Sequence, residues 1–408
     1  MTGVTILQVV PRLDTGGSEQ ATIEIAEALT RAGATALVAT AGGRMTAAVT
    51  RSGGEVITLP VASKNPFTIL ANARRLETLI NDRSVDLVHA RSRAPGWSAF
   101  LAARRSGRPF VTTYHGAYGS LGPLKAAYNS VMGRGDRVIA NSLYTAKLIA
   151  ERQHAARDRI RIVYRGIDNA TFDPLVVPPG PVAKLRERWG VKPETKIVLQ
   201  AARLTGLKGH RHTIEAAAKL DRQGALDGAV IVFAGDAPGK AAYRQELIDL
   251  IARRGLQRKV LLVGHCDDMP SAFLAAHVAI LPSLVAETFG RTSIEAQAMG
   301  CPVIVSDLGA LPETIDAAGG VADFTGWLVG AGDADALAAK IALALALTPE
   351  ERSAIGARAH ARVSALFELS QMQTKTLQVY DELLGTHLAE RFADPPALRS
   401  AMDMENPA

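Results

Sequence analysis

The sequence predicts two α/β domains, each built on a parallel β-sheet with helices on both faces. Three observations lead to this expectation. The chain has 408 residues, a length that suits two domains better than one. Short apolar segments alternate with amphipathic helical segments, which is typical of parallel sheets. The alternation stops once, at a proline-rich segment, and then starts again.

The first half of the chain contains seven short apolar segments that we predict to be strands. Between the first two, Ser18–Ala32 places Ile25, Ala28 and Leu29 on one face of a helix. The predicted strands are Val4–Val10, Thr35–Thr40, Val56–Leu59, Asp86–Ala90, Phe110–Tyr114, Val138–Asn141 and Ile160–Tyr164.

The interruption is Phe172–Pro181, whose four prolines are incompatible with a central strand or a helix interior. We predict a linker here, between an N-terminal domain over residues 1–172 and a C-terminal domain over residues 182–362. Two such sheets facing each other would place the carboxyl ends of their strands, where ligands bind, on opposite walls of one cleft. The predicted strands of the second domain are Lys196–Ala202, Val230–Gly235, Val260–Gly264, Val278–Pro282, Pro302–Ser306 and Trp327–Val329.

Two features of the C-terminal end complete the organisation. Ser364–Leu384 has a long helical pattern. Residues 393–408 carry prolines and little apolar periodicity, so we predict a flexible tail.

Composition bounds the class of protein. With 48% hydrophobic and 21% charged residues, the chain reads as globular. Its two cysteines, Cys266 and Cys301, cannot form a disulfide framework and suit a reducing compartment. No signal peptide and no apolar run approaching about 18 residues is evident. We therefore expect a cytoplasmic protein that is soluble or bound peripherally to a membrane.

Charge is distributed unevenly. Residues 1–180 hold 22 Lys and Arg against 13 Asp and Glu, whereas the whole chain has 46 against 40. A basic half suits an anionic membrane or an anionic acceptor, or it is ordinary solvated surface. Because the basic residues are scattered, aromatics make up 5% and no recognised motif is present, we do not expect a nucleic-acid partner.

A pair of glutamates predicts a ligand site in the second domain. Glu287 lies in a loop that ends at Phe289-Gly290, and Glu295 lies two turns into the helix that starts near Arg291. The free N–H groups of that helix start suit a phosphate, and carboxylates accept sugar hydroxyls. This pattern fits one carboxylate on a hexose, one on a ribose and a phosphate between them. The alternative is two surface glutamates.

Two cations disfavour that alternative. Arg203 and Lys208 follow the strand Lys196–Ala202 and open the next helix. At the carboxyl end of a strand they can hold a diphosphate and stabilise its charge as it leaves. Either cation alone would more often be ordinary surface.

The first domain adds weaker candidates. Gly16 and Gly17 precede a helix and form either an anion-facing turn or a plain tight turn. They are not a dinucleotide-binding G-x-G-x-x-G motif. His115 ends the fifth predicted strand, where it either meets a ligand or is structural.

Taken in order, the motifs between residues 195 and 330 resemble the donor domain of glycosyltransferase family 4. They are Arg203, Lys208-Gly209, Phe233-Ala-Gly-Asp236, Val263-Gly264, Glu287 with Glu295, Pro302-Val-Ile304 and Gly309-Ala-Leu-Pro-Glu313. The resemblance implies a GT-B fold, that is, two Rossmann-like domains facing across a cleft, with the C-terminal helix 364–384 bracing the first. It also implies a nucleotide-sugar donor, retention at the anomeric carbon, and no metal or other cofactor.

The resemblance also implies roles for the candidate residues. Arg203 and Lys208 would bind the diphosphate and Glu295 the ribose. Glu287 and the backbone of residues 289–291 would hold the donor sugar.

In the first domain, Gly16 and Gly17 would face the donor phosphate and the acceptor. His115 would contact the donor sugar and stabilise the transition state rather than act as a base. The catalytic set would then be Glu287, His115, Arg203 and Lys208.

The sequence departs from the family at one place. Many relatives have Asn where this chain has Arg165, in Arg165-Gly-Ile-Asp168. We expect this segment to be a strand end with a glycine turn. Leu121–Asp136 is amphipathic and basic, which fits either an ordinary core-facing helix or docking on an anionic membrane.

The function predicted is transfer from a nucleotide-diphosphate sugar, a UDP-sugar ahead of GDP-mannose, to a glycan or lipid-linked acceptor. Family habit points to cell-surface polysaccharide, lipopolysaccharide or glycolipid synthesis, at the cytoplasmic face of the inner membrane. Two alternatives stay open: a sugar-nucleotide epimerase on the same fold, and a non-catalytic nucleotide-sugar binding subunit. We see no closely spaced carboxylates for a metal, since Asp333-Ala-Asp335 looks like a helix start.

Overall fold

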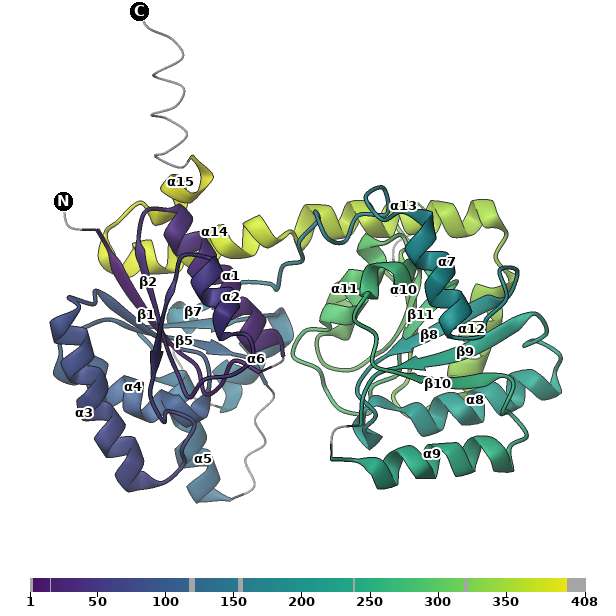
Figure 1. Cartoon of the computed structure of the whole chain (residues 1–408), viewed down its shortest axis with the longest axis horizontal. Coiled ribbons are helices and arrows are strands. Elements are labelled where there is room, and N and C mark those ends of the chain that lie inside the picture. The colour runs from purple at the N-terminus through teal and green to yellow at the C-terminus, as the bar shows by residue number, and fades with distance from the viewer. Residues whose placement is uncertain are drawn as a thin grey trace, which may run out of the picture. The chain divides into compact units, whose positions relative to one another are not determined.

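The computed structural model describes residues 3–14, 16–116, 122–152, 157–237, 239–318 and 322–394. The chain divides into two compact units (Figure 1). The first consists of Met1–Gly166 with Leu369–Ala408, and the second of Ile167–Glu368.

Over the described residues, the first unit holds a seven-stranded parallel sheet in the order β3-β2-β1-β4-β5-β6-β7. Strand β1 pairs with β2 on one side and β4 on the other, with Ile6 opposite Ala36 and Leu87. The strands are β1 (Thr5–Val9), β2 (Thr35–Thr40), β3 (Glu55–Thr58), β4 (Leu87–Ala90), β5 (Phe110–Tyr114), β6 (Arg137–Ala140) and β7 (Ile160–Ile162).

Helices cover both faces of this sheet because its strands are apolar on both faces. Ile6 packs with α1 (Gly17–Arg31), α14 (Leu369–Leu384) and α15 (Leu388–Ala393). Its neighbour Leu7 faces the other way, toward α3 (Pro66–Asp82) and α4 (Arg93–Arg105). The remaining helices described here are α2 (Thr46–Arg51), α5 (Pro123–Asn129), α6 (Leu143–Arg152) and the 3₁₀ turns Ser130–Gly133 and Arg157–Arg159.

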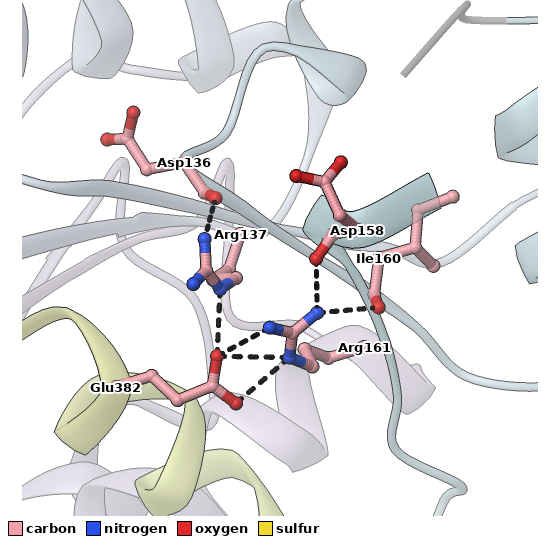
Figure 2. A network of polar contacts seen from close by, with 6 residues as sticks. All are labelled: Asp136, Arg137, Asp158, Ile160, Arg161 and Glu382. Carbon is pink, nitrogen blue, oxygen red and sulfur yellow. Dashed lines mark hydrogen bonds and ion pairs between the residues drawn. The ribbon is translucent and has the colours of Figure 1, made fainter. Parts of the chain in front are cut away.

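Helix α14 comes from the far end of the sequence and is fixed to this sheet by polar contacts as well as by its apolar face. Tyr380 is fully buried, and its hydroxyl lies 2.6 Å from Nδ1 of His89 on β4. Glu382 accepts hydrogen bonds from Arg137 on β6 (2.8 Å) and Arg161 on β7 (2.9 Å) (Figure 2). One carboxylate thus ties the last long helix to two neighbouring strands.

The second unit repeats the architecture with a parallel sheet of six strands among the residues described, in the order β10-β9-β8-β11-β12-β13. Alternate residues of β8 again face opposite layers: Ile197 packs with α7, α10 and α11, and Val198 with α8, α9 and α12. The strands are β8 (Lys196–Ala201), β9 (Ala229–Ala234), β10 (Val260–Gly264), β11 (Val278–Leu281), β12 (Val303–Ser306) and β13 (Gly326–Val329).

The helices of this unit follow the strands in the usual crossover connections. They are α7 (Pro179–Arg188), α8 (His210–Arg222), α9 (Ala241–Arg253), α10 (Met269–Ala275), α11 (Arg291–Ala298), α12 (Ala334–Ala346), α13 (Pro349–Leu366) and the 3₁₀ turns Gly206–Lys208 and Leu311–Thr314.

The predicted fold class is confirmed: the chain has two Rossmann-like parallel sheets, and every predicted strand is present, most with ends shifted by one residue. Strand β7 is shorter than expected and stops at Ile162.

The predicted linker Phe172–Pro181 needs correction. Helix α7 already starts at Pro179, because proline suits the first position of a helix. Phe172 and Val177 pack against the core of the second unit. The segment therefore belongs to that unit, whose boundary lies at Gly166/Ile167.

The expectation of one helical segment over Ser364–Leu384 was also wrong. Helix α13 ends at Leu366 and α14 begins at Leu369. Between them Phe367 accepts a hydrogen bond at its carbonyl from the N–H of Ile167 (2.9 Å), and Glu368 forms a β-bridge with Ile167. Of the predicted tail, Ala393 ends α15, and residues 395–408 lie outside the described residues.

Candidate functional site

The strand order of the second unit places a pocket at the centre of its sheet. The chain leaves β8 toward one edge and β11 toward the other, so the connections diverge between these neighbours. A pocket of about 220 Å³ opens there, at the carboxyl ends of both strands. Its lining includes Gln200, Arg203, Lys208, Ser283, Glu287, Gly290 and Arg291.

The backbone of Lys208 is fixed by buried polar side chains and by the glycine that follows it. Its carbonyl accepts a hydrogen bond from the side chain of Gln200 (2.7 Å), whose own carbonyl oxygen accepts from Thr213 (2.8 Å). Gln200 and Thr213 are both buried. Gly209 follows with φ 76°, and a β-carbon there would lie 2.0 Å from the carbonyl oxygen of Pro282. Only glycine therefore lets the chain turn from Lys208 into α8.

Both the backbone and the side chain of Glu287 are held by hydrogen bonds. Its carbonyl accepts from the N–H of Ala310 (2.9 Å), and the chain around Gly309 leaves no room for a side chain. Its carboxylate atom Oε1 accepts from Nζ of Lys208 and from the hydroxyl of Ser283 (2.6 Å). The Lys208 and Glu287 side chains are 26% and 22% exposed, so a ligand can still reach this ion pair.

Helix α11 begins at the pocket. Its N-cap residue is Gly290 with φ 116°, a glycine that has no side chain with which to cap the first N–H groups. These groups and the positive end of the helix dipole suit an anion. Arg291 donates from Nε to Oε1 of Glu295 (2.8 Å), so the second glutamate carries an ion pair beside the helix start.

Two predicted residues of this set lie outside the pocket lining. Phe289 is buried and packs edge-on against Phe367, with ring centres 5.6 Å apart. Its side chain is part of the core, so the role predicted at this position belongs to the backbone. Glu295 lies one helical turn after Arg291, outside the pocket lining, and accepts a hydrogen bond from that arginine.

Sequence reasoning missed Gln200 and Ser283. Each carries a signal in hindsight, because each is a polar residue at the carboxyl end of an otherwise apolar strand segment. Both are at least nine-tenths buried, and each binds one charged residue of the pocket: Gln200 binds the backbone carbonyl of Lys208, and Ser283 binds the carboxylate of Glu287.

In the first unit, Gly16 is the N-cap of α1 and Gly17 its first residue. Gly16 has φ 147°, a conformation that favours glycine, and a β-carbon there would lie 2.6 Å from a carboxylate oxygen of Glu19, whose side chain would have to move. No side chain caps the described start of α1.

His115 follows β5 and contacts Arg165, whose Nη2 donates to Nδ1 of the ring. A guanidinium group can only donate, so Nδ1 accepts and the proton of the neutral ring lies on Nε2. Burial holds the pKa of His115 well below its usual value, and the nearby charges of Arg165 and Arg91 lower it further. His115 is therefore a neutral imidazole near neutral pH.

The expectation for Arg165 was incomplete. Arg165 is not a strand end, because β7 already stops at Ile162. It is buried, and its side chain contacts His115, the predicted active-site histidine. Arg91, also buried and missed from the sequence, donates from Nε to the side chain of Gln8 (2.8 Å).

The amphipathic segment Leu121–Asp136 divides into two parts. Leu121 lies outside the described residues. On α5, Leu124 is 87% exposed and followed by Lys125, so this turn does not face the core. Val131 and Met132, in contrast, are fully buried.

Among the residues that the structure describes, no three His, Cys, Asp or Glu side chains gather as a metal site. No helix in the described part of the chain has both the length and the apolar character needed to cross a membrane.

Comparison with known proteins agrees with the fold and the motifs. Residues 15–171 match the family Glycosyltransferase Family 4, and residues 182–362 match Glycosyl transferases group 1. The solved glycosyltransferase from Rickettsia africae ESF-5 is 34% identical, with a TM-score of 0.86 over 95% of this chain and 100% of that one.

Two further relatives are more distant. A D-inositol 3-phosphate glycosyltransferase of Mycolicibacterium gilvum is 28% identical over 81% of this chain and 73% of its own length. The fold is shared by Anabaena Alr3699/HepE, solved in complex with UDP and glucose, at 23% identity and a TM-score of 0.79 over 93% of this chain and 99% of that one. With family matches to both halves of the chain and its two Rossmann-like sheets, the protein is a glycosyltransferase of GT-B fold that belongs to glycosyltransferase family 4.

Proposed function

We propose that this enzyme transfers a sugar from a nucleotide-diphosphate donor, a UDP-sugar ahead of GDP-mannose, to a glycan or lipid-linked acceptor. The observation that carries the proposal is the pocket at the β8/β11 switch point. There Lys208, Glu287 and the N-terminus of α11 meet.

Each part of the donor has a chemical partner in this arrangement. Lys208, Arg203 and the first N–H groups of α11 suit the diphosphate, and Glu287 suits hydroxyl groups of the sugar. Glu295 is proposed for the ribose. The complex of Alr3699/HepE with UDP and glucose favours UDP over other nucleotides.

We further propose retention of the anomeric configuration without a metal ion. Two cations and a helix dipole supply the positive charge that a leaving diphosphate needs. The neutral His115 donates from Nε2 to the transferred sugar and does not act as a base. Gly16 and Gly17 face the donor phosphate and the acceptor.

The acceptor is proposed to be a precursor of a surface polysaccharide, lipopolysaccharide or glycolipid, reached at the cytoplasmic face of a membrane. The excess of basic residues in the first 180 positions supports an anionic surface or acceptor. The exposed Leu124 beside Lys125 supports peripheral docking through α5.

The test is a thermal-shift panel in EDTA with UDP, GDP and ADP, UDP-glucose, UDP-N-acetylglucosamine, GDP-mannose and ADP-glucose. A ligand at one hundred times its Kd adds about 2.7 kcal/mol of stability, which gives a clear shift. We expect one nucleotide family to stabilise the protein and Lys208→Ala to abolish the effect. A protein that responds to none of these ligands would contradict the proposal.

Turnover supplies the second arm. Once an acceptor is known, Lys208→Ala and Glu287→Ala should each lower kcat by at least about a hundredfold, the scale of losing one preorganised transition-state contact. Near-normal turnover would remove that residue from the site. An inverted anomeric configuration in the product, read by NMR, would reject retention.

A further inference from the structure

Ser283 lies at the base of the pocket and contacts a charged residue. It follows β11 and Pro282, is 2% exposed and lines the pocket. Its hydroxyl lies 2.6 Å from Oε1 of Glu287, and its own N–H donates to the carbonyl of Leu281 (2.9 Å). A short, buried side chain on a bonded backbone has little freedom to move.

The carboxylate of Glu287 is engaged on one oxygen. Lys208 and Ser283 both donate to Oε1, and among the residues that the structure describes no other side chain donates to this carboxylate. Since Glu287 lines the pocket and its side chain is 22% exposed, Oε2 is the oxygen left to a ligand.

The two donors differ in what they do when a diphosphate arrives. Lys208 is a flexible cation that also lines the pocket, so its ammonium group can turn toward phosphate oxygens. Ser283 is too short to follow. It therefore keeps Oε1 in place while Lys208 shares its charge with the phosphate.

We infer that Ser283 is a positioning residue for donor-sugar recognition: by holding Oε1 of Glu287 it presents Oε2 to the hydroxyl groups of the transferred sugar. This inference rests on the proposed role of Glu287. It assigns Ser283 to the sugar and not to the nucleotide, because its hydroxyl acts through the carboxylate.

The test separates the two parts of the donor. Calorimetry would measure Kd for the sugar nucleotide that gives the largest thermal shift and for its bare nucleoside diphosphate. Ser283→Ala should raise the Kd of the sugar nucleotide about tenfold, as expected for losing a hydrogen bond to a charged group. The Kd of the bare nucleoside diphosphate should change by no more than about twofold. An equal loss for both ligands, or no loss, would overturn the inference.

Ser306→Ala is the matched control. Ser306 is a fully buried serine on β12 of the same unit, and its hydroxyl has no hydrogen-bond partner among the described residues. This variant reports the effect of removing a buried hydroxyl alone, so both affinities should stay near those of the wild type. A thermal midpoint for each free variant checks that the fold is kept.

A double-mutant cycle with Glu287→Ala identifies the route. If Ser283 acts through Glu287, adding Ser283→Ala to Glu287→Ala costs no further affinity for the sugar nucleotide. Additive losses would show a separate structural role and reject the inference. If Glu287→Ala itself leaves sugar-nucleotide binding unchanged, the proposed function of Glu287 fails, which is a different result from a silent Ser283→Ala.

Discussion

At the scale of single residues, Arg165 and His115 show how one neighbour can set the chemistry of a ring. The guanidinium on Nδ1 fixes the tautomer, and its charge adds to burial in disfavouring the imidazolium. A histidine in this state donates a hydrogen bond from Nε2 and resists protonation.

Nitrogen NMR of ¹⁵N-histidine-labelled protein tests this state. In the wild type we expect Nδ1 of His115 unprotonated, Nε2 protonated, and no titration near the ordinary histidine pKa of about 6.5. Arg165→Met should raise the pKa of His115 and mix the two tautomers, because the donor and its charge are removed.

Arg157→Met serves as the control, since Arg157 is an exposed arginine of the same unit. It should leave the His115 signals unchanged. A proton on Nδ1 in the wild-type protein would contradict the assignment.

The candidate site could be predicted from the sequence where its residues form a local motif. Lys208, Glu287, Gly290 and Arg291 were predicted because they follow strands or open helices, and the structure places all four in the lining of one pocket. The contact of Arg165 with His115 was not predicted, because the two residues are 50 positions apart and meet only in the packed sheet. Ser283 was missed because a lone serine after a strand has many possible roles.

At the scale of elements, α5 presents an apolar side chain to solvent next to a basic one. If this turn docks on a membrane, the wild type should bind anionic liposomes in a low-salt sedimentation assay. Leu124→Ser with Lys125→Glu should weaken binding about tenfold or more, since a basic residue near an anionic surface is worth about 1 kcal/mol and a buried leucine somewhat more.

Leu343→Ser is the matched control, because Leu343 is 53% exposed on α12 of the second unit. It should bind liposomes like the wild type. No binding by the wild type at low salt would reject docking, and equal losses in both variants would reject α5 as the contact.

The elements themselves were largely predictable. Apolar runs bounded by turns gave the strands, since both faces of a parallel sheet are buried. The errors lie where tertiary contacts decide: Pro179 starts a helix inside a segment that reads as a linker, and Phe367-Glu368 interrupts a helical pattern because the backbone there pairs with Ile167. Neither contact has a signal within a short stretch of sequence.

At the scale of the whole molecule, buried histidines make the fold sensitive to acid. Burial lowers the pKa of His210 to about 4, and that of His277 to about 4, and holds His89 and His115 below their usual value. In the unfolded chain these groups protonate near pH 6.5. Between the folded-state pKa of about 4 and the unfolded-state pKa of about 6.5, the unfolded state binds more protons than the folded state. The contribution of these histidines to the free energy of unfolding is therefore constant above about pH 6.5 and falls as the pH drops toward 4.

Urea denaturation at neutral pH and at about pH 5 measures this slope. His210 is fully buried and packs in T-shaped contacts with the rings of Phe233 and Tyr243. The distances between ring centres are 5.0 Å to Phe233 and 6.3 Å to Tyr243. His210 alone should remove about 1.4 kcal/mol per pH unit within the window. His210→Phe should flatten the slope by that amount, and an unchanged slope would show that His210 is not the source.

The anchoring of α14 has a consequence for how the chain is made. The first unit needs Tyr380 and Glu382, which are synthesised after every residue of the second unit. The second unit is continuous in sequence and emerges complete from the ribosome while the first still lacks its closing helix. Domains usually finish folding in their order along the chain. Here the unit that begins first is completed last, so a chain cut short before α14 would carry a finished second unit and an unfinished first unit.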